Sequence, residues 1–370
     1  MSKNISELPY TEIVERAIEL GRIREEVRGK VRGLVNDLYV RDIPQKEDWS
    51  FLFARSSLTT IVSFNSGNAT IQPGSSIVTF SSDVTTTSSM TGRKIKFSGN
   101  DYVYDVVSMS GNTGLVIGPS FGGQDVLSSV SYDIFQTTYP LSLDFDRFPK
   151  NGGLHRFSGG GKQVIPEKGY DYYLSNFSSV PNDTQTFCII FGADTAGNRQ
   201  VELQPPPKSQ TSIEYDYVKR LNPLRETTAG SATVSAQGTT VTGHENSLFT
   251  EARTGDYFRI NAFGKSANSE WFKIIAIPNN TTLTLALAFG LSGATSAGYT
   301  ISSVPQFPSA IQPALLYGAI AQIDADQDDP MATIYFQKYA QVLSDGKRVY
   351  KSRLYQQDIA TIAEDYRYRY

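Results

Sequence analysis

The chain has 370 residues, a formal net charge of −3 and a sequence pI of about 5.6. This length allows two or three domains with cores of their own, and the slightly acidic balance gives no general attraction to nucleic acid or to anionic membranes. A single cysteine, Cys188, excludes an internal disulfide framework and is typical of a reducing compartment. The N-terminus lacks the apolar stretch of a secretory signal, and no run approaches the roughly 18–20 apolar residues that span a bilayer.

The first predicted element is a helix over residues 10–40, in an N-terminal helical part that covers 1–58. Thr11 is the expected N-cap, and Gly21 is expected to split the helix. Each half has an apolar stripe at spacings of three and four, formed by Ile13, Val14, Ala17 and Ile18 and by Ile23, Val27, Val31, Leu34, Val35 and Leu38. Pro44 is expected to end the helix, and Trp49 to lie in the core that joins it to a sheet.

One β unit occurs twice, at residues 59–138 and 229–305. In both copies, short alternating runs are separated by turn residues, in the same order and at a near-constant offset. The matching pairs of runs are 67–71 with 230–234, 91–97 with 254–260, 102–109 with 271–277, and 131–134 with 298–301. The sequence therefore predicts two small antiparallel β-barrels or sandwiches of the same topology. Their lack of charged clusters favours contacts with other protein subunits.

A central β layer is predicted for residues 139–228, between the two copies. Residues 141–145, 200–204 and 213–218 alternate between apolar and polar side chains, which predicts strands with one buried face. Residues 186–191 form a continuous apolar run, which predicts a buried central strand.

The chain returns to helix at residues 306–346. Ser309 is the expected N-cap of a helix over 310–323, and Asp329 caps a second helix with Pro330 at its first position. Gly346 is expected to end or bend this helix. The helices at the two ends of the chain bury their apolar faces most simply against each other and the central layer. The predicted fold class is α+β, mainly β: terminal helices packed with a central β layer, plus two repeated β insertions.

The motifs that carry chemistry in other proteins are incomplete here. The only histidines, His155 and His244, lie in different units, and no nucleophile elbow accompanies them. Residues 264–266 resemble the end of a phosphate-binding loop, but they lie between β runs, so we expect a hairpin turn. The acidic stretch 324–329 lacks the glycine of an EF-hand loop and is expected to be a solvated interhelical loop, with divalent-ion binding as the alternative. Cys188 is expected to be an inert core thiol. We therefore predict no enzyme, no cofactor and no metal site.

A basic, tyrosine-rich tail is predicted at residues 347–370. Lys347, Arg348, Lys351, Arg353, Arg367 and Arg369 outnumber three acidic residues and alternate with Tyr350, Tyr355, Tyr366, Tyr368 and Tyr370. Too few aliphatic residues are present to form a core, so the tail is expected to be flexible in the monomer. Tyr and Arg carry much of the binding energy at protein interfaces, which favours a docking role.

This layout resembles the head-to-tail adaptor (connector or neck) proteins of tailed double-stranded DNA bacteriophages. The similarity lies in residues 31–49, a helix followed by Trp49; in residues 201–207 and 213–218, a proline-ended strand and a Tyr-x-Tyr strand; and in residues 308–338, a helical pair. The first of these helices carries Leu315, Tyr317, Ala319 and Ala321. The resemblance covers about half of the chain, and the two β insertions depart from the compact helical adaptors.

The resemblance implies a homo-oligomeric ring, commonly of twelve copies, in the neck of the virion between the portal protein and the tail, nozzle or fibre proteins. Such a protein is made in the host cytoplasm, and double-stranded DNA passes through the ring. We expect no strong or sequence-specific DNA affinity and no membrane partner. The resemblance also implies that the tail inserts between portal subunits, with Lys351, Arg353, Tyr355, Tyr366, Arg367, Tyr368, Arg369 and Tyr370 as the docking residues.

Two other functions stay open at the sequence level. One is a tail nozzle, tail-tube or fibre-attachment protein. The other is a carbohydrate-binding or carbohydrate-cleaving surface protein, in which aromatic pairs such as Trp271 and Phe272 or Tyr102 and Tyr104 stack on sugars. Because alternation buries one face of each strand, we expect these aromatics to be partly core residues. Binding to a glycan array would favour the carbohydrate function, and ring formation with an isolated portal would favour the adaptor.

Overall fold

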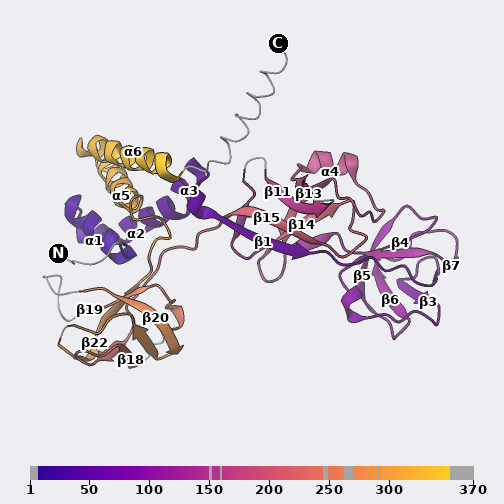
Figure 1. Cartoon of the computed structure of the whole chain (residues 1–370), viewed down its shortest axis with the longest axis horizontal. Coiled ribbons are helices and arrows are strands. Elements are labelled where there is room, and N and C mark those ends of the chain that lie inside the picture. The colour runs from indigo at the N-terminus through magenta and orange to yellow at the C-terminus, as the bar shows by residue number, and fades with distance from the viewer. Residues whose placement is uncertain are drawn as a thin grey trace, which may run out of the picture. The chain divides into compact units, whose positions relative to one another are not determined.

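The structure is a computed structural model that describes residues 7–149, 152–158, 161–244, 249–261, 270–290 and 292–350. The chain divides into two compact units, one formed by residues 1–52 and 221–370 and the other by residues 53–220. The fold is α+β and mainly β, as predicted, with several antiparallel sheets. Figure 1 labels many of the elements, and each unit is described by itself.

The first unit contains a helical body built from both ends of the chain, α1 and α2 together with α5 and α6 (Figure 1). Its elements are α1 Tyr10–Leu20, the 3-10 turn Glu25–Val27, α2 Arg28–Asp37, the π-helical turn Leu38–Asp42, α3 Ile43–Lys46, the 3-10 turn Ser50–Leu52, α5 Gln312–Asp326 and α6 Met331–Tyr350. The predicted apolar stripes face this shared core, where Ile13, Val14, Val31 and Val35 are fully buried. The prediction that the terminal helices bury their apolar faces against each other is confirmed.

Gly21 ends α1, as predicted. The prediction that Thr11 is the N-cap of this helix was wrong. Pro9 occupies the N-cap position, and Thr11 lies inside the helix. Its hydroxyl donates to Oε2 of Glu226 at 3.1 Å, so a tertiary partner uses the group that we expected to cap the helix. Pro44 does not end the helical stretch either, because it lies in the first turn of α3, where a missing N–H costs nothing.

The helix boundaries near the C-terminus also differ from the prediction. Asp329 accepts a hydrogen bond from the backbone N–H of Met331 at 2.8 Å, as expected of a capping side chain, but α6 begins at Met331 and not at Pro330. Ser309 does not cap α5, which begins at Gln312 with Ile311 at its N-cap. Gly346 does not end α6, which continues to Tyr350. A Cβ at Gly346 would lie 3.0 Å from a side-chain atom of Ile311, so the glycine allows close helix packing.

The two predicted β copies share one topology. The first copy is a seven-stranded sheet in the order β7-β2-β3-β6-β5-β4-β8, and the second has the matching order β22-β17-β18-β21-β20-β19-β23, with β16 added at the end. Their strands are β2 Ala69–Ile71, β3 Ile77–Phe80, β4 Lys94–Phe97, β5 Val103–Met109, β6 Gly114–Gly118, β7 Leu127–Val130 and β8 Tyr132–Phe135, then β16 Glu226–Thr227, β17 Ser231–Val234, β18 Thr240–His244, β19 Tyr257–Ile260, β20 Phe272–Asn279, β21 Thr282–Leu285, β22 Ala294–Ala297 and β23 Tyr299–Ser302. We call these two sheets module 1 and module 2. Module 1 lies in the second unit and module 2 in the first.

Equivalent hydrogen bonds confirm the duplication at the level of single residues. The hydroxyl of Tyr132 donates to the carbonyl of Ser66 at 2.6 Å, and the hydroxyl of Tyr299 donates to the carbonyl of Ala229 at 2.7 Å. In addition, Ser129 and Ser296 both adopt a positive φ, of 56° and 46°. Each donates its backbone N–H to the threonine hydroxyl at the matching position in the neighbouring strand, Thr70 or Thr233.

One buried position distinguishes the modules. Arg93 in module 1 and Asp256 in module 2 follow equivalent glycines of positive φ, and each is only 8 % exposed. The guanidinium of Arg93 donates to the carbonyl of Ser89, whereas the carboxylate of Asp256 accepts from the backbone of Arg253. Burial lowers the pKa of Arg93 and raises that of Asp256. The equivalent buried position is therefore occupied by a basic residue in module 1 and by an acidic residue in module 2.

The rest of the second unit is a β layer of two sheets around one core, formed by residues of the predicted layer 139–228 together with β1, which the prediction had placed in the N-terminal helical part. One sheet has the order β1-β15-β11-β12 with β10 also paired to β15, and the other has the order β13-β14-β9. The strands are β1 Phe53–Thr59, β9 Thr138–Pro140, β10 Phe145–Arg147, β11 Gly153–Ser158, β12 Gly161–Pro166, β13 Phe187–Ala193, β14 Arg199–Gln204 and β15 Ser212–Lys219. Side chains of both sheets, such as Leu203 and Tyr215, share one apolar cluster.

Two predictions for this layer were wrong. A strand was predicted over residues 141–145, but β10 begins only at Phe145. Leu141 is buried although it lies outside any strand. Strand β13 is the outer strand of its sheet and not a central one. Its first three residues are buried, but Phe191 near its end is 52 % exposed.

Candidate functional site

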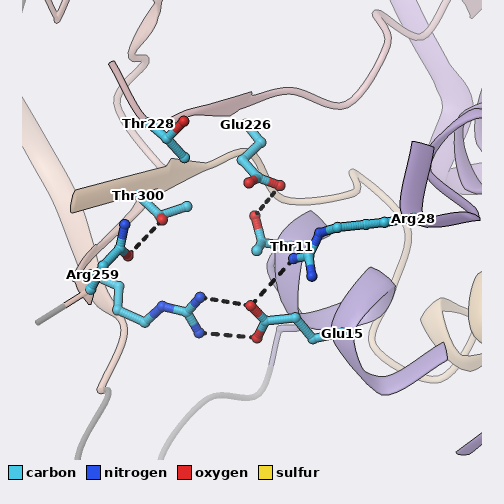
Figure 2. Close-up of a pocket in the computed structure, with 8 residues that line it drawn as sticks. Thr11, Glu15, Arg28, Glu226, Thr228, Arg259 and Thr300 are labelled. Atoms are coloured by element: carbon cyan, nitrogen blue, oxygen red, sulfur yellow. Dashed lines mark hydrogen bonds and ion pairs between the residues drawn. The ribbon is translucent and has the colours of Figure 1, made fainter. Parts of the chain in front are cut away.

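The best-defined charged site lies in the first unit, where α1 meets module 2. It is a pocket of about 300 Å³ lined by Thr11, Glu15, Arg28, Glu226, Thr228, Arg259, Asn261 and Thr300. Figure 2 shows the side chains of α1 and α2 pointing toward those of the sheet. The pocket thus forms where the N-terminal helices α1 and α2 meet residues 226–300 of the same unit.

The centre of this site is a paired guanidinium and carboxylate. Arg259 of β19 donates from both terminal nitrogens to Glu15 of α1, at 2.8 and 3.1 Å, and the two side chains are only 10 % and 12 % exposed (Figure 2). Arg28 approaches the same carboxylate at 3.5 Å and is also paired with Glu25 at 2.7 Å. Although burial opposes its charge, the pKa of Arg28 is raised, because Glu25 and Glu15 lie beside it.

A second carboxylate closes the other side of the pocket. Glu226 of β16 accepts from Arg32 at 2.7 Å and from the hydroxyl of Thr11 at 3.1 Å. On the sheet, Thr300 donates to the side-chain oxygen of Asn261 at 2.7 Å. The charges of the pocket are therefore matched by partners inside the protein. Both carboxylates of the pocket, Glu15 and Glu226, are held in ion pairs, so the arrangement connects α1 and α2 to the sheet.

Further polar contacts extend this site along the first half of α1. The indole of Trp271 donates to Glu12 at 3.3 Å, and the guanidinium of Arg259 stacks over the Trp271 ring at 4.3 Å. The backbone N–H groups of Tyr10 and Thr11 donate to Ser303 and Ser302 at 2.8 and 2.9 Å. We call this set of contacts the polar joint. Because hydrogen bonds and ion pairs are directional, the joint fixes the angle at which module 2 meets the helical body.

The sequence did not predict the polar joint. Glu15 and Arg259 are 244 positions apart, and no local pattern connects them. One indication was present in the sequence: Arg259 lies between the apolar residues Phe258 and Ile260. The structure shows that all four residues of this strand are buried. A charged residue inside a fully buried strand requires a partner, so its presence predicts a contact, although it does not name the partner.

The predicted docking residues Lys351, Arg353, Tyr355, Tyr366, Arg367, Tyr368, Arg369 and Tyr370 lie outside the described residues. The start of the predicted tail needs correction. Residues 347–350 belong to the last turn of α6, where Lys347 pairs with Glu47 at 2.6 Å and Tyr350 packs edge-on against Phe51 at 5.8 Å. These contacts hold the end of α6 on the helical body, so a tail can begin only after Tyr350.

The other residues whose side chains could take part in catalysis do not form a common site. His155 is buried in β11 with its Nε2 atom 3.8 Å from Asp216, whereas His244 is exposed in β18 of the other unit. Cys188 is fully buried, and burial raises the pKa of its thiol to about 12, as expected for an inert core thiol. Residues 264–266 lie outside the described part of the chain.

The acidic stretch 324–329 begins in α5 and does not act as one loop. Asp324 is buried, and its burial and the charge of Asp329 raise its pKa, while Asp326 pairs with Lys30 at 2.6 Å. Among the residues that the structure describes, no group of three or more His, Cys, Asp or Glu side chains has a geometry suited to a metal ion. Within the same part of the chain, no helix combines the length and apolarity needed to cross a membrane.

Comparison with known proteins adds little to these observations. No protein-family model and no curated protein matches the chain. Two structures of translation elongation factor SelB from Methanococcus maripaludis, the apo form and the complex with the GTP analogue GPPNHP, are 12 % and 11 % identical to it. Each alignment covers 69 % of this chain and 63 % of the SelB chain, with a TM-score of 0.15. The chain thus spans less than two thirds of SelB, and a likeness at this score carries no argument.

Proposed function

We propose that this chain is a structural subunit of a bacteriophage virion, a head-to-tail adaptor that forms an oligomeric ring between the portal vertex and the tail. In this role it is not an enzyme. Its partners are further copies of the chain, the portal protein and the tail, nozzle or fibre proteins. Double-stranded DNA passes through the ring without sequence-specific binding. The protein is made in the host cytoplasm and resides in the neck of the virion.

The observation that carries this proposal is the shared helical body. The two helical stretches that resemble adaptor proteins, residues 31–49 and 308–338, are far apart in the sequence and pack together in one unit. Gly318 of α5 allows the closest approach, because a Cβ there would lie 2.8 Å from the Leu38 side chain. The Tyr39 and Phe307 rings lie 4.9 Å apart, and Trp49 is fully buried. A helical body made from both chain ends, with β modules inserted between them, supports a scaffold function.

The nature of the charged site supports the same conclusion. The carboxylates that line the pocket at the polar joint, Glu15 and Glu226, are paired with Arg259 and Arg32 of the same unit, which favours a rigid connection between the elements. A ring subunit must keep its shape while DNA passes through the ring, and directional contacts between its parts help it to do so.

The segment after α6 supplies the proposed contact with the portal. Because α6 is held on the body up to Tyr350, the basic, tyrosine-rich residues 351–370 follow directly from a fixed point. We propose that this segment binds between portal subunits, with Arg367 and Arg369 meeting carboxylates and the tyrosines filling apolar pockets.

Truncation of the chain after Tyr350 tests the proposed contact. The truncated protein is expected to stay folded and to lose co-sedimentation with isolated portal rings. Two substitution variants provide a matched pair: R367K/R369K keeps the charge, and R367E/R369E reverses it. The charge-reversal variant is expected to weaken portal binding more strongly than the lysine variant. Normal portal binding by the truncated protein would show that residues 351–370 are not the anchor.

A further inference from the structure

One face of module 1 and one face of module 2 are built from equivalent residues. In module 1, Lys96 of β4 lies opposite Asp133 of β8 in the strand register, and in module 2 Arg259 of β19 lies opposite Thr300 of β23. The residue pairs of the two registers match one to one, so Lys96 occupies in module 1 the place that Arg259 occupies in module 2. We call this face of each module its joint face.

The joint face of module 2 is covered by a helix. Glu15 of α1 accepts two hydrogen bonds from Arg259, at 2.8 and 3.1 Å (Figure 2). Under this cover, Arg259 and Thr300 are only 8 and 3 % exposed. The joint face of a module is therefore suited to a helix that presents a carboxylate to the basic residue at the position of Arg259.

The joint face of module 1 is open. It contains a cavity of about 330 Å³, similar to the pocket of about 300 Å³ at the joint face of module 2. Asn65 and Ser98 in its lining are exposed, and Lys96 and Asp133 are half-buried. The lining from outside residues 65–133 consists of residues 179–180, which belong to no helix or strand. In the part of the chain that the structure describes, no helix thus lines this cavity as α1 lines the pocket of module 2.

Lys96 lacks the counter-ion that Arg259 has. Its ammonium group donates to the hydroxyl of Ser179 at 2.7 Å, and it forms no ion pair with any residue that the structure describes. A half-buried cation has lost part of its hydration, and a hydroxyl compensates for this loss less than a carboxylate does. The best complement to Lys96 is thus a carboxylate supplied by a partner.

The second charge of the cavity adds a requirement on the partner. Asp133 stands where module 2 has the uncharged Thr300, and among the described residues it too has no partner in an ion pair. A partner that brings a base beside its carboxylate satisfies both charges. The helices on module 2 have this arrangement, since Arg28 of α2 lies 3.5 Å from Glu15.

We propose that the joint face of module 1 binds a helix of a partner protein, which places a carboxylate on Lys96 and a base beside Asp133. The partner is another protein because Glu15 of α1, the helix that covers the equivalent face, is already bound to Arg259 in module 2. The proposal uses neither the ring nor the portal, so it and the proposed function fail separately.

A synthetic copy of α1 serves as the probe for this site. The peptide spans residues 7–22, with a fluorescent dye at its N-terminus and a hydrocarbon staple between positions 16 and 20. Both positions are exposed in α1 and lie one turn apart, so the staple orders the helix before binding and leaves Glu15 free. In fluorescence anisotropy with the full chain, we expect a dissociation constant on the order of 100 μM. The E15Q peptide is expected to bind about fivefold more weakly, because an amide replaces the carboxylate.

Variants of the chain show whether the peptide binds at Lys96. K96E is expected to weaken binding at least ~10-fold, since repulsion replaces attraction, and the E15K peptide is expected to recover most of this loss on K96E. The matched control is K94E, two positions away on the same strand, where Lys94 is already paired with Asp105 at 2.9 Å. This control should bind the peptide like the wild type, and circular dichroism checks that both variants fold.

The proposal is overturned if the peptide shows no binding up to ~1 mM of the chain, ten times the expected constant. Equal binding of the E15Q peptide and the unchanged peptide, or equal losses in K96E and K94E, would also overturn it. Because the E15Q comparison changes only the peptide, it decides the matter even if K96E does not fold.

Discussion

Removal of one partner of the buried ion pair at the polar joint is expected to destabilise the first unit strongly. The variant E15Q leaves the guanidinium of Arg259, only 10 % exposed, without its paired carboxylate. Breaking a buried pair from one side costs about 3–5 kcal/mol. Since glutamine still accepts one hydrogen bond, we expect the lower end, about 3 kcal/mol. In a domain of 150–250 residues this loss lowers the Tm by about 6–12 °C.

Tryptophan fluorescence in urea reports this effect without interference from the second unit. The chain has two tryptophans, Trp49 and Trp271, and both lie in the first unit. The matched control is D326N, which removes the partner of Lys30 in an ion pair whose side chains are more than half exposed. Exposed pairs contribute about 0–1 kcal/mol, so the control should shift the urea midpoint little.

A double replacement separates the ion pair from the packing. In E15L/R259M no charge is left unpaired, so the double variant should be more stable than E15Q. If E15Q and D326N lose the same free energy of unfolding, the pair at the polar joint is not a buried contact and the account of the joint is refuted.

Four other outcomes follow from the structure. The variant G318V should cost about 1–3 kcal/mol, measured by urea unfolding, because a Cβ at Gly318 already lies 2.8 Å from Leu38 and 3.2 Å from Tyr339; a neutral effect would show that α5 is not tightly packed. The variants Y132F and Y299F each remove one equivalent hydrogen bond, so both should cost about 1 kcal/mol in calorimetry, and a large difference between them would contradict the equivalence of the modules. The free energy of unfolding should fall as the pH rises above about 9. Burial raises the pKa of Cys188 and of Tyr39 to about 12, whereas these groups ionise near 9 and 10 in the unfolded chain, which therefore loses its protons first. Urea midpoints that stay constant between about pH 8 and 11 would contradict this. Binding to duplex DNA at physiological salt should be weaker than micromolar in fluorescence anisotropy, and sub-micromolar binding would contradict the proposed sliding of DNA.

The duplication was predictable because its determinants are local. Alternation of apolar residues and the glycines between the runs follow from the geometry of strands and turns, and both recur in the same order in the two copies. The sequence also shows the apolar faces of the terminal helices. The structure adds the strand order and the matching contacts, such as those of Ser129 and Ser296.

The helix ends were harder to predict because distant partners use the relevant groups. Thr11 has a typical capping side chain, but its hydroxyl binds Glu226, which is 215 positions away. Gly346 has the composition of a helix end, but its lack of a side chain allows Ile311 and Trp49 to approach α6. In both cases the residue type was recognised and its tertiary contact was not.

The polar joint and the exposure of α4, Tyr170–Asn176, could not be derived from sequence for the same physical reason. The pairing of Glu15 with Arg259 and the exposure of α4 are properties of the assembled chain. Residues 170–177 have a composition that also suits a buried helix, and only the fold shows that most of their side chains are exposed.

The most direct test of the proposed function is electron microscopy of the purified full-length protein mixed with isolated portal rings. The adaptor function predicts a second ring, coaxial with the portal and bound to one of its faces, with a central channel wide enough for duplex DNA. Portal rings that stay bare at micromolar concentrations of the protein, while the protein itself is folded, would contradict the proposal.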